Sequence, residues 1–394
     1  MSQSNPLPLS GGMQYQLRIY SEGKKQVKPL LPVAFEDLEQ KARETMSPEA
    51  FAYVAGGAGG ETTMSNNKSA FNRWQIVPRM MGDVSKRSIS IDLFGTQLAS
   101  PVLLAPVGVL SIAHPEAELA VARAAKALQV PQVVSTVSSK TLEEIATVHA
   151  EHPHWFQLYW GRDNDFTRAI IERAEKSGYT AIVVTLDTRL FAWRERDIQN
   201  AYLPFLYGDG LSNYLTDPVF LSAIGDPSTN QLQTMMHFAH CFSNPSSEWI
   251  DLEVIRKCTK LPVIVKGIQH PADAQKAIDH GADGIVVSNH GGRQLDGAIG
   301  ALDTLAGIAD AVGNKTTILF DSGIRRGADV FKAMALGAKA VLLGRPYAYG
   351  LALAGEQGVR EVIGNLLADI DLTLGLAGCT TWAEVSKENL YRAV

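Results

Sequence analysis

The segment His290-Gly291-Gly292-Arg293 has the clearest capacity for chemistry in this chain. Histidine has an unperturbed pKa near neutrality, so it can take up and release a proton at physiological pH. Asn289 precedes it and two glycines follow it at an accessible position, and the guanidinium of Arg293 is a fork of donors suited to a carboxylate or phosphate. We therefore expect His290 to act as a general base.

Lys266 ends a short apolar run, and the sequence leaves several functions open to it. As a Schiff-base nucleophile it would make the protein an aldolase. As a fixed positive charge it would stabilise an anion beside it. A structural function, the capping of carbonyl groups at a strand end, is also open.

Glycine and arginine occur together at two further places, in Gly323-Ile324-Arg325 and in Gly344-Arg345. Such segments can present backbone N–H groups and positive charge to a phosphate. Both follow consecutive apolar runs late in the chain, where barrel enzymes usually hold a phosphate. We expect a phosphate site here.

These residues stand at the ends of short apolar runs that alternate with amphipathic stretches. Such alternation predicts βαβ units and a parallel sheet. Eight runs favour a closed (β/α)8 TIM barrel over a doubly wound sheet, and the strand ends then converge on one mouth. The runs occupy residues 101–106, 131–135, 155–159, 180–185, 261–266, 284–288, 316–321 and 340–344.

The domain organisation predicted from this rhythm is simple. Residues 1–30 are a polar N-terminal tail and residues 31–394 form a single barrel domain, in which residues 34–95 are a helical extension that closes the barrel bottom. Residues 188–250 interrupt the rhythm after the fourth strand. Because connections this long are usually functional or disordered, we expect an active-site lid.

Composition excludes several classes of function. The chain of 394 residues is 46% hydrophobic, and its net charge of −5 gives no basic surplus for nucleic acid or an anionic membrane. Three widely spaced cysteines form neither a disulfide framework nor a metal-binding pair, so no metal is expected. No G-x-S-x-G, P-loop or Rossmann fingerprint is present. The lack of a signal peptide or long apolar segment favours the cytoplasm.

Three motifs resemble those of the FMN-dependent L-2-hydroxy acid oxidase family. They are Val265-Lys266-Gly267-Ile268, Ser288-Asn289-His290-Gly291-Gly292-Arg293-Gln294 and Asp321-Ser322-Gly323-Ile324-Arg325, and the likeness covers nearly the whole chain from about residue 30. The resemblance implies a barrel, FMN as cofactor, a small 2-hydroxy acid and O2 as substrates, and a homotetramer.

The resemblance also implies functions for individual residues. His290 would take the proton of the substrate hydroxyl while hydride passes from Cα to the flavin. Arg194 and Arg293 would bind the substrate carboxylate with Tyr53, and Tyr159 would lie near the hydroxyl. The residues that would hold FMN are Pro106, Val107, Gly108, Ser135, Gln157, Thr185, Lys266, Ser288, Asp321, Ser322, Gly323, Arg325, Gly344 and Arg345.

Within the family, three features are most similar to the lactate 2-monooxygenases: the long insertion, the segment Leu186-Asp187-Thr188, and Gly108 where oxidases commonly have alanine. A glycine there is expected to leave space over the flavin. One departure is Val137, where many oxidases have an aromatic residue.

The activity so implied is the oxidation of L-lactate by O2, coupled to decarboxylation of the retained pyruvate to acetate, CO2 and water. The alternatives are an oxidase that releases a 2-oxo acid and H2O2, a Lys266 aldolase, and an inactive flavin-binding scaffold.

Overall fold

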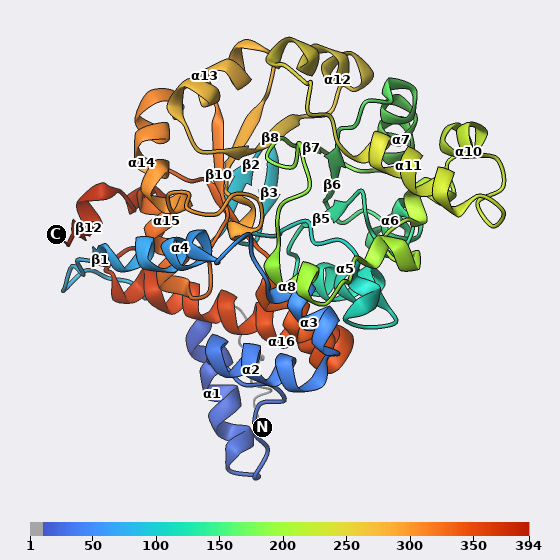
Figure 1. Cartoon of the computed structure of the whole chain (residues 1–394). Coiled ribbons are helices and arrows are strands. Elements are labelled where there is room, and N and C mark those ends of the chain that lie inside the picture. The colour runs from blue at the N-terminus through green and yellow to red at the C-terminus, as the bar shows by residue number, and fades with distance from the viewer. Residues whose placement is uncertain (1–10, 394) are drawn as a thin grey trace.

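The computed structural model describes residues 11–393 and contains a closed barrel of parallel strands (Figure 1). The strands pair in chain order, and the last pairs with the first through the register Val341 to Val102. The predicted TIM barrel is confirmed. Its strands are β4 (Val102–Leu104), β5 (Gln132–Ser135), β6 (His154–Tyr159), β7 (Ile182–Thr185), β8 (Val263–Ile268), β9 (Gly284–Val287), β10 (Thr317–Phe320) and β11 (Ala340–Leu343).

The strands are buried on both faces, which is why they read as apolar runs. Alternate residues such as Leu103, Val133 and Val183 form an inner core that fills the barrel. The antiparallel hairpin of β2 (Ile91–Leu93) and β3 (Thr96–Leu98) closes the bottom, because Leu93 and Leu98 belong to the same cluster. The barrel mouth therefore lies at the opposite, carboxyl ends of the strands.

A ring of helices surrounds the barrel (Figure 1). The first four that cover it are α5 (Ala117–Ala127), α6 (Leu142–His149), α7 (Asn164–Lys176) and α12 (Leu252–Cys258). The next four are α13 (Pro271–Asp279), α14 (Ala301–Val312), α15 (Gly327–Ala335) and α16 (Arg345–Leu376), the last broken at Ala354 and Gly355. Among the described residues, no helix combines the length and apolar character needed to cross a membrane.

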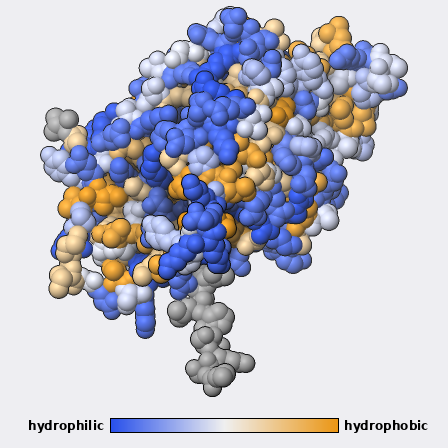
Figure 2. Space-filling model, turned by 90° about the horizontal axis from the view of Figure 1, so that it is seen from below, coloured by the Kyte–Doolittle hydropathy of each residue, from blue (hydrophilic) through white to orange (hydrophobic). Residues whose placement is uncertain are grey.

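The N-terminal extension adds α1 (Gly12–Gly23), α2 (Phe35–Thr45), α3 (Pro48–Ala55) and α4 (Thr62–Asn72). Part of the predicted tail is thus a helix. Its Gly12 backbone N–H donates to Asp371 (2.7 Å) and its Tyr15 hydroxyl to Asn365 (3.0 Å), both on α16. Residues 1–10 of that tail lie outside the described residues. Seen from below in Figure 2, the surface is mostly hydrophilic, with hydrophobic residues in separate patches.

Short elements complete the chain. Strand β1 (Trp74–Ile76) pairs with β12 (Leu390–Arg392), which brings the C-terminal segment beside α4. The 3-10 turns η1 (Leu110–Ile112) and η4 (His290–Gly292) follow the barrel strands β4 and β9. Two others, η5 (Trp382–Glu384) and η6 (Lys387–Asn389), precede β12.

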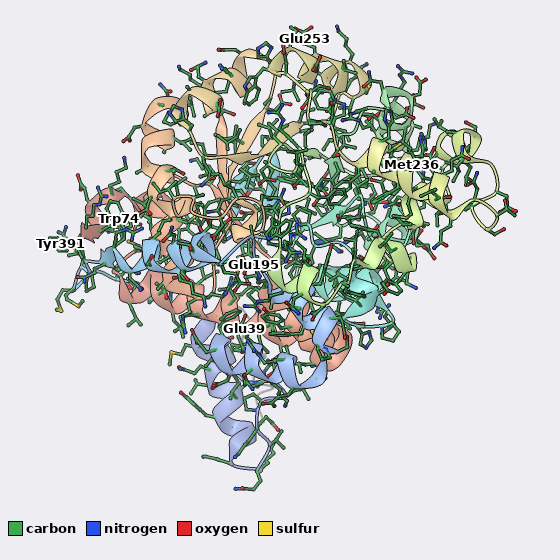
Figure 3. The ribbon with its side chains drawn as sticks, in the orientation of Figure 1. Glu39, Trp74, Glu195, Met236, Glu253 and Tyr391 are labelled. Carbon is green, nitrogen blue, oxygen red and sulfur yellow. The ribbon has the colours of Figure 1, made fainter. Side chains whose placement is uncertain are left out.

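The insertion after β7 divides into two parts. It contains α8 (Glu195–Gln199), η2 (Pro204–Tyr207), α9 (Ser212–Leu215), α10 (Pro218–Ile224), α11 (Gln231–Phe242) and η3 (Trp249–Asp251). Residues between 188 and 205, together with Phe242, line the mouth cavity, whereas α9 and α10 pack on the flank of the barrel against α6 and α7. Figure 3 labels Glu195 on α8, in the middle of the view, and Met236 on α11, at one side. Only part of the predicted lid therefore covers the cavity.

Candidate active site

A cavity opens at the carboxyl ends of the barrel strands and is lined by residues from almost every part of the mouth. It collects fifteen of the nineteen predicted site residues. They are Tyr53, Pro106, Val107, Gly108, Tyr159, Arg194, Lys266, His290, Arg293, Asp321, Ser322, Gly323, Arg325, Gly344 and Arg345.

His290 is held by an aspartate that the sequence analysis did not assign. Nδ1 of His290 lies 2.8 Å from Oδ1 of Asp187, so the ring donates its Nδ1 hydrogen to the carboxylate and keeps Nε2 free to accept a proton. Burial lowers the pKa of His290, the Asp187 charge opposes that shift, and the Lys266 charge adds to it. The imidazole is therefore neutral at pH 7, as a general base must be.

The Asp187 side chain has room in this position only because residue 267 is a glycine. At Gly267, with φ of +111°, a Cβ atom would lie 2.7 Å from Cβ of Asp187. Burial by itself would raise the pKa of Asp187, but the interactions of its carboxylate with His290 and with the charge of Lys266 outweigh burial, so the pKa of Asp187 is lowered. Its position directly after strand β7, with the other mouth residues, was the signal that could have identified it.

The turn that carries His290 is fixed by two serine hydroxyls. Oγ of Ser288 accepts from the His290 N–H (3.0 Å), and Oγ of Ser322 accepts from the N–H groups of Asn289 (3.2 Å) and Gly291 (3.0 Å). These bonds hold His290 at a φ of +58°, in the left-handed region. Ser288 therefore positions His290 through this hydrogen bond and does not itself line the cavity.

Lys266 is a fixed charge in this structure. Its Nζ lies 3.0 Å from Oγ of Ser288 and 3.3 Å from Oδ2 of Asp321. Burial would lower the pKa of Lys266, but the carboxylates of Asp321 and Asp187 outweigh it, so the pKa is raised. A Schiff-base nucleophile needs a neutral amine, so this geometry argues against the aldolase.

Three polar side chains on neighbouring strands form a buried row. Ser135 donates to Gln157 (3.1 Å), and Gln157 donates to Thr185 (2.9 Å). Like Ser288, these residues do not line the cavity. The row places amide and hydroxyl groups across the barrel at the level of Lys266, because Thr185 pairs with Lys266 in the sheet register.

One side of the cavity carries the arginines predicted to bind a carboxylate. Arg293 Nη1 donates to the backbone oxygens of Tyr53 (2.6 Å) and Gly56 (2.8 Å). Arg194 donates to the Arg293 backbone oxygen (3.2 Å) and to Gln294 (3.0 Å). Burial, with the nearby charges of Arg194 and Arg345, lowers the pKa of Arg293 to about 9. An anion bound here would offset the burial and the repulsion between these arginines.

The part of the cavity lined by Gly344 and Arg325 suits a phosphate. Helix α16 begins at Arg345, and its N-cap Gly344 leaves the first N–H groups without a side-chain cap. Nε of Arg325 is buried and has no partner within residues 11–393, and burial lowers the pKa of this arginine to about 10. The guanidinium of Arg345 instead donates to the backbone oxygens of Gly291 (3.0 Å) and Gly56 (2.9 Å).

The remaining wall of the cavity is apolar, and the insertion supplies most of it. Phe242 packs against Tyr159 (ring centroids 4.5 Å apart) and stacks on Phe191 (5.1 Å). Phe205 lies 6.0 Å from Phe242, and Val137 completes this wall. The sequence indicated Phe205 only as part of the long insertion and did not indicate Phe191 or Phe242, because no pattern shows which aromatic residues of a long insertion face a cavity.

Gly108 does not keep space open in the way that the sequence analysis expected. A Cβ atom at Gly108 would lie 2.5 Å from Cγ2 of Val137 and 2.6 Å from its backbone oxygen. The glycine therefore allows the loops after β4 and β5 to approach each other, and a methyl group would push them apart instead of filling the cavity. The two departures from the common oxidase pattern, Gly108 and Val137, touch each other.

Comparison with known proteins decides which family has this site. The sequence model of the FMN-dependent dehydrogenase family matches residues 42–392. The chain belongs to that family. It is 44% identical over 355 residues to an L-lactate oxidase of Lysinibacillus sphaericus, covering 89% of this chain and 90% of the relative.

Two other relatives agree. An FMN-dependent alpha-hydroxy acid dehydrogenase of Penicillium citrinum is 42% identical over 383 residues, covering 96% of this chain and 95% of the relative. The crystal structure of a mandelate oxidase superimposes with a TM-score of 0.81 at 41% identity, covering 91% of this chain and 98% of that one. FMN is confirmed as the cofactor, and 2-hydroxy acid oxidation as the activity.

The residues of this family member fit FMN. The N-terminus of α16 and Arg325, whose Nε has no partner among the described residues, would hold the phosphate, and Lys266 would approach the polar edge of the ring system. His290 and Arg293 line the same cavity, where a 2-hydroxy acid would lie beside the ring.

Proposed function

We propose that this family member is an L-lactate 2-monooxygenase. In the net reaction, L-lactate and O2 give acetate, CO2 and water. The first half oxidises lactate to pyruvate and reduces O2 to H2O2. In the second half, H2O2 attacks the keto carbon of the pyruvate that has not left, and loss of CO2 and water gives acetate.

The chain's own groups support the first half. Nε2 of His290 removes the hydroxyl proton, and the Asp187 carboxylate stabilises the imidazolium that forms. Arg293 and Arg194 bind the substrate carboxylate and so fix the direction in which Cα points. Bound FMN supplies the two-electron acceptor for the hydride of Cα and returns these electrons to O2.

The second half depends on retention of pyruvate, and one observation carries this part of the proposal. Phe191, Phe205 and Phe242 come from three separate places in the insertion and meet over the apolar side of the cavity. Such a cover slows the exit of a small product, and product release then decides between acetate and pyruvate. The methyl group of lactate fits this apolar wall better than a charged side chain of another 2-hydroxy acid would.

The second candidate is an L-lactate oxidase that releases pyruvate and H2O2. The relative from Lysinibacillus sphaericus favours it, because that protein is an L-lactate oxidase and is similar over most of its length. The two activities use the same base, carboxylate site and cofactor. They differ only in whether pyruvate leaves before peroxide reacts with it.

One assay separates them. Free pyruvate and H2O2 form acetate slowly without an enzyme, so L-lactate turnover in air is measured with and without added catalase. Catalase removes H2O2 from solution but does not reach peroxide inside a closed cavity. The monooxygenase gives one acetate for each lactate in both samples. Pyruvate as the main product with catalase would establish the oxidase. Assembly into a homotetramer and a cytoplasmic location remain predictions.

A further inference from the structure

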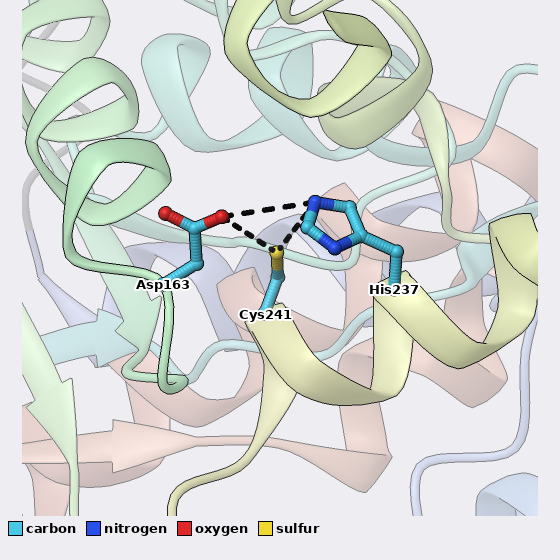
Figure 4. Close-up of side chains that lie close together, drawn as sticks. All are labelled: Asp163, His237 and Cys241. Carbon is cyan, nitrogen blue, oxygen red and sulfur yellow. Dashed lines mark hydrogen bonds and ion pairs between the residues drawn. The ribbon is translucent and has the colours of Figure 1, made fainter. Parts of the chain in front are cut away.

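Three side chains with metal-binding atoms meet outside the active site, where α11 contacts the barrel flank. His237 and Cys241 lie one turn apart on α11, and Asp163 precedes α7 (Figure 4). The ligand atoms lie within 4.8 Å of one another. Asp163 is far from Cys241 in the sequence, which is why cysteine and histidine spacing gave no sign of this cluster.

The distances between these atoms are close to, or a few tenths of an ångström longer than, the edges of a coordination tetrahedron. Nε2 of His237 lies 3.5 Å from Sγ of Cys241 and 3.7 Å from Oδ2 of Asp163, and the sulfur and this oxygen are 4.0 Å apart. Tetrahedral zinc with ordinary bond lengths requires ligand separations of about 3.3–3.6 Å. Shifts of a few tenths of an ångström would bring all three atoms to one ion.

The ligand atoms are available to an ion. Asp163 uses its other oxygen, Oδ1, to cap α7 through the Phe166 N–H (2.9 Å), which leaves Oδ2 facing His237 and Cys241. Cys241 is 1% exposed and is a free thiol. A thiolate, a carboxylate and a neutral imidazole around a divalent cation sum to zero charge, which suits a buried position.

We propose that Asp163, His237 and Cys241 bind one Zn²⁺ ion, with a water molecule in the fourth position. A mixed sulfur, nitrogen and oxygen set favours zinc over Mg²⁺ or Ca²⁺, which prefer oxygen ligands only. Binding displaces the proton of the Cys241 thiol to solvent, so zinc affinity rises with pH.

The ion would join α11 to the flank of the barrel. Asp163 belongs to the barrel flank, and the Arg162 N–H there already donates to the His240 oxygen on α11 (2.8 Å). Phe242 follows Cys241 directly and covers the cavity. Zinc at this site therefore fixes α11 and, with it, the position of Phe242.

The test uses the FMN-loaded enzyme, stripped with a chelator and then titrated with Zn²⁺ in competition with a chromophoric chelator. We expect one tightly bound zinc per chain, a Tm that rises with zinc concentration, and slower hydrogen exchange in α11. Asp163→Asn keeps an N-cap residue for α7 but removes the carboxylate. This variant, His237→Gln and Cys241→Ser should each weaken zinc binding by roughly tenfold or more.

Two matched controls lie close by. His240→Gln changes another histidine of α11, and Cys258→Ser changes another free cysteine, and both should bind zinc as the wild type does. The proposal is overturned if the wild type retains no zinc after desalting. It is equally overturned if Asp163→Asn and His237→Gln, folded and yellow, bind zinc with unchanged affinity, or if the controls lose it to the same extent.

Discussion

The carboxylate of Asp187 lies directly behind His290, with Oδ1 2.8 Å from Nδ1 of the ring. Asp187 follows strand β7 and His290 follows β9, so the barrel closure brings together two residues about a hundred positions apart in the chain. The second carboxylate oxygen, Oδ2, is buried without a partner in the described residues. The pair sets both the tautomer of the base and its charge.

Loss of the base should slow catalysis without loss of the cofactor. In His290→Ala, FMN should bind as before, because its phosphate and ring contacts lie on other residues. Reduction of the flavin by L-lactate should slow by roughly 10²–10⁴-fold, the usual contribution of a general base. Anaerobic stopped-flow measurement of flavin bleaching checks this. A variant that bleaches at the wild-type rate would remove His290 from the mechanism.

Asp187→Asn should change both the rate and the pH profile. The Asp187 charge raises the pKa of His290, so its removal lowers that pKa and moves the acid limb of kcat/KM to lower pH. The charge-assisted hydrogen bond to the imidazolium is also lost, which costs about 1.5–3 kcal/mol, or roughly 10- to 100-fold in rate. Thr188→Val, which removes a hydrogen bond to Asp187 Oδ1 (3.2 Å) but keeps the carboxylate charge, is the control. An unchanged acid limb would mean that Asp187 does not act through His290.

Arg293→Met should lose affinity for anions. Removing a buried partner of a carboxylate typically costs about 2–5 kcal/mol. We expect a weaker Kd for oxalate, measured from the flavin absorbance change, together with slower reduction by lactate. Arg189→Met, an exposed arginine of the same insertion that bonds the Pro245 oxygen, should behave as the wild type does. Unchanged oxalate affinity in a yellow Arg293→Met enzyme would mean that the carboxylate binds elsewhere.

A cluster of three histidines below the barrel should make the fold sensitive to acid. His149 stacks on His154 (4.7 Å) and His152 (5.7 Å). Burial lowers the pKa of all three, that of His149 to about 2, and Lys126 lies near His149 and His152. Unfolded histidine titrates near pH 6.5, so as the pH falls below this value the unfolded chain takes up protons that the native protein does not, and stability is lost.

Each such histidine contributes a slope of about 1.4 kcal/mol per pH unit. Urea unfolding at several pH values between 7 and 5 measures this slope. In His149→Gln, which preserves a neutral side chain beside Gln132, the slope should become shallower. The exposed His240→Gln should leave it unchanged. An equal slope in wild type and His149→Gln would show that acid lability arises elsewhere.

Much of this architecture is encoded locally in the sequence. The barrel strands were predictable because each is a short β-rich run buried on both faces, and His290 and Arg293 because their residue types and strand-end positions indicate chemistry. The division of the insertion into a part that covers the cavity and a part that packs on the flank was not predictable from the sequence. The buried Asn213 side chain accepts a hydrogen bond from the Leu142 N–H, and the buried Asp217 carboxylate pairs with Arg173. Nothing near Asn213 or Asp217 in the sequence indicates these partners.

Gly108→Ala tests how the loops around the cavity pack. The new methyl group would meet Cγ2 and the backbone oxygen of Val137, so it should separate the loops after β4 and β5. Overpacking of this kind costs about 1–3 kcal/mol. We therefore expect a lower Tm and weaker FMN binding, measured by thermal unfolding and by flavin release. Adding Val137→Ala to this variant removes Cγ2 but not the backbone oxygen, so the double variant should recover part of the lost Tm and part of the lost FMN affinity. Val134→Ala is the control, because Val134 lies in β5 outside this contact, and it should recover neither. A stable Gly108→Ala enzyme that binds FMN normally and changes only its ratio of acetate to pyruvate would instead restore the interpretation that this glycine holds space for the product.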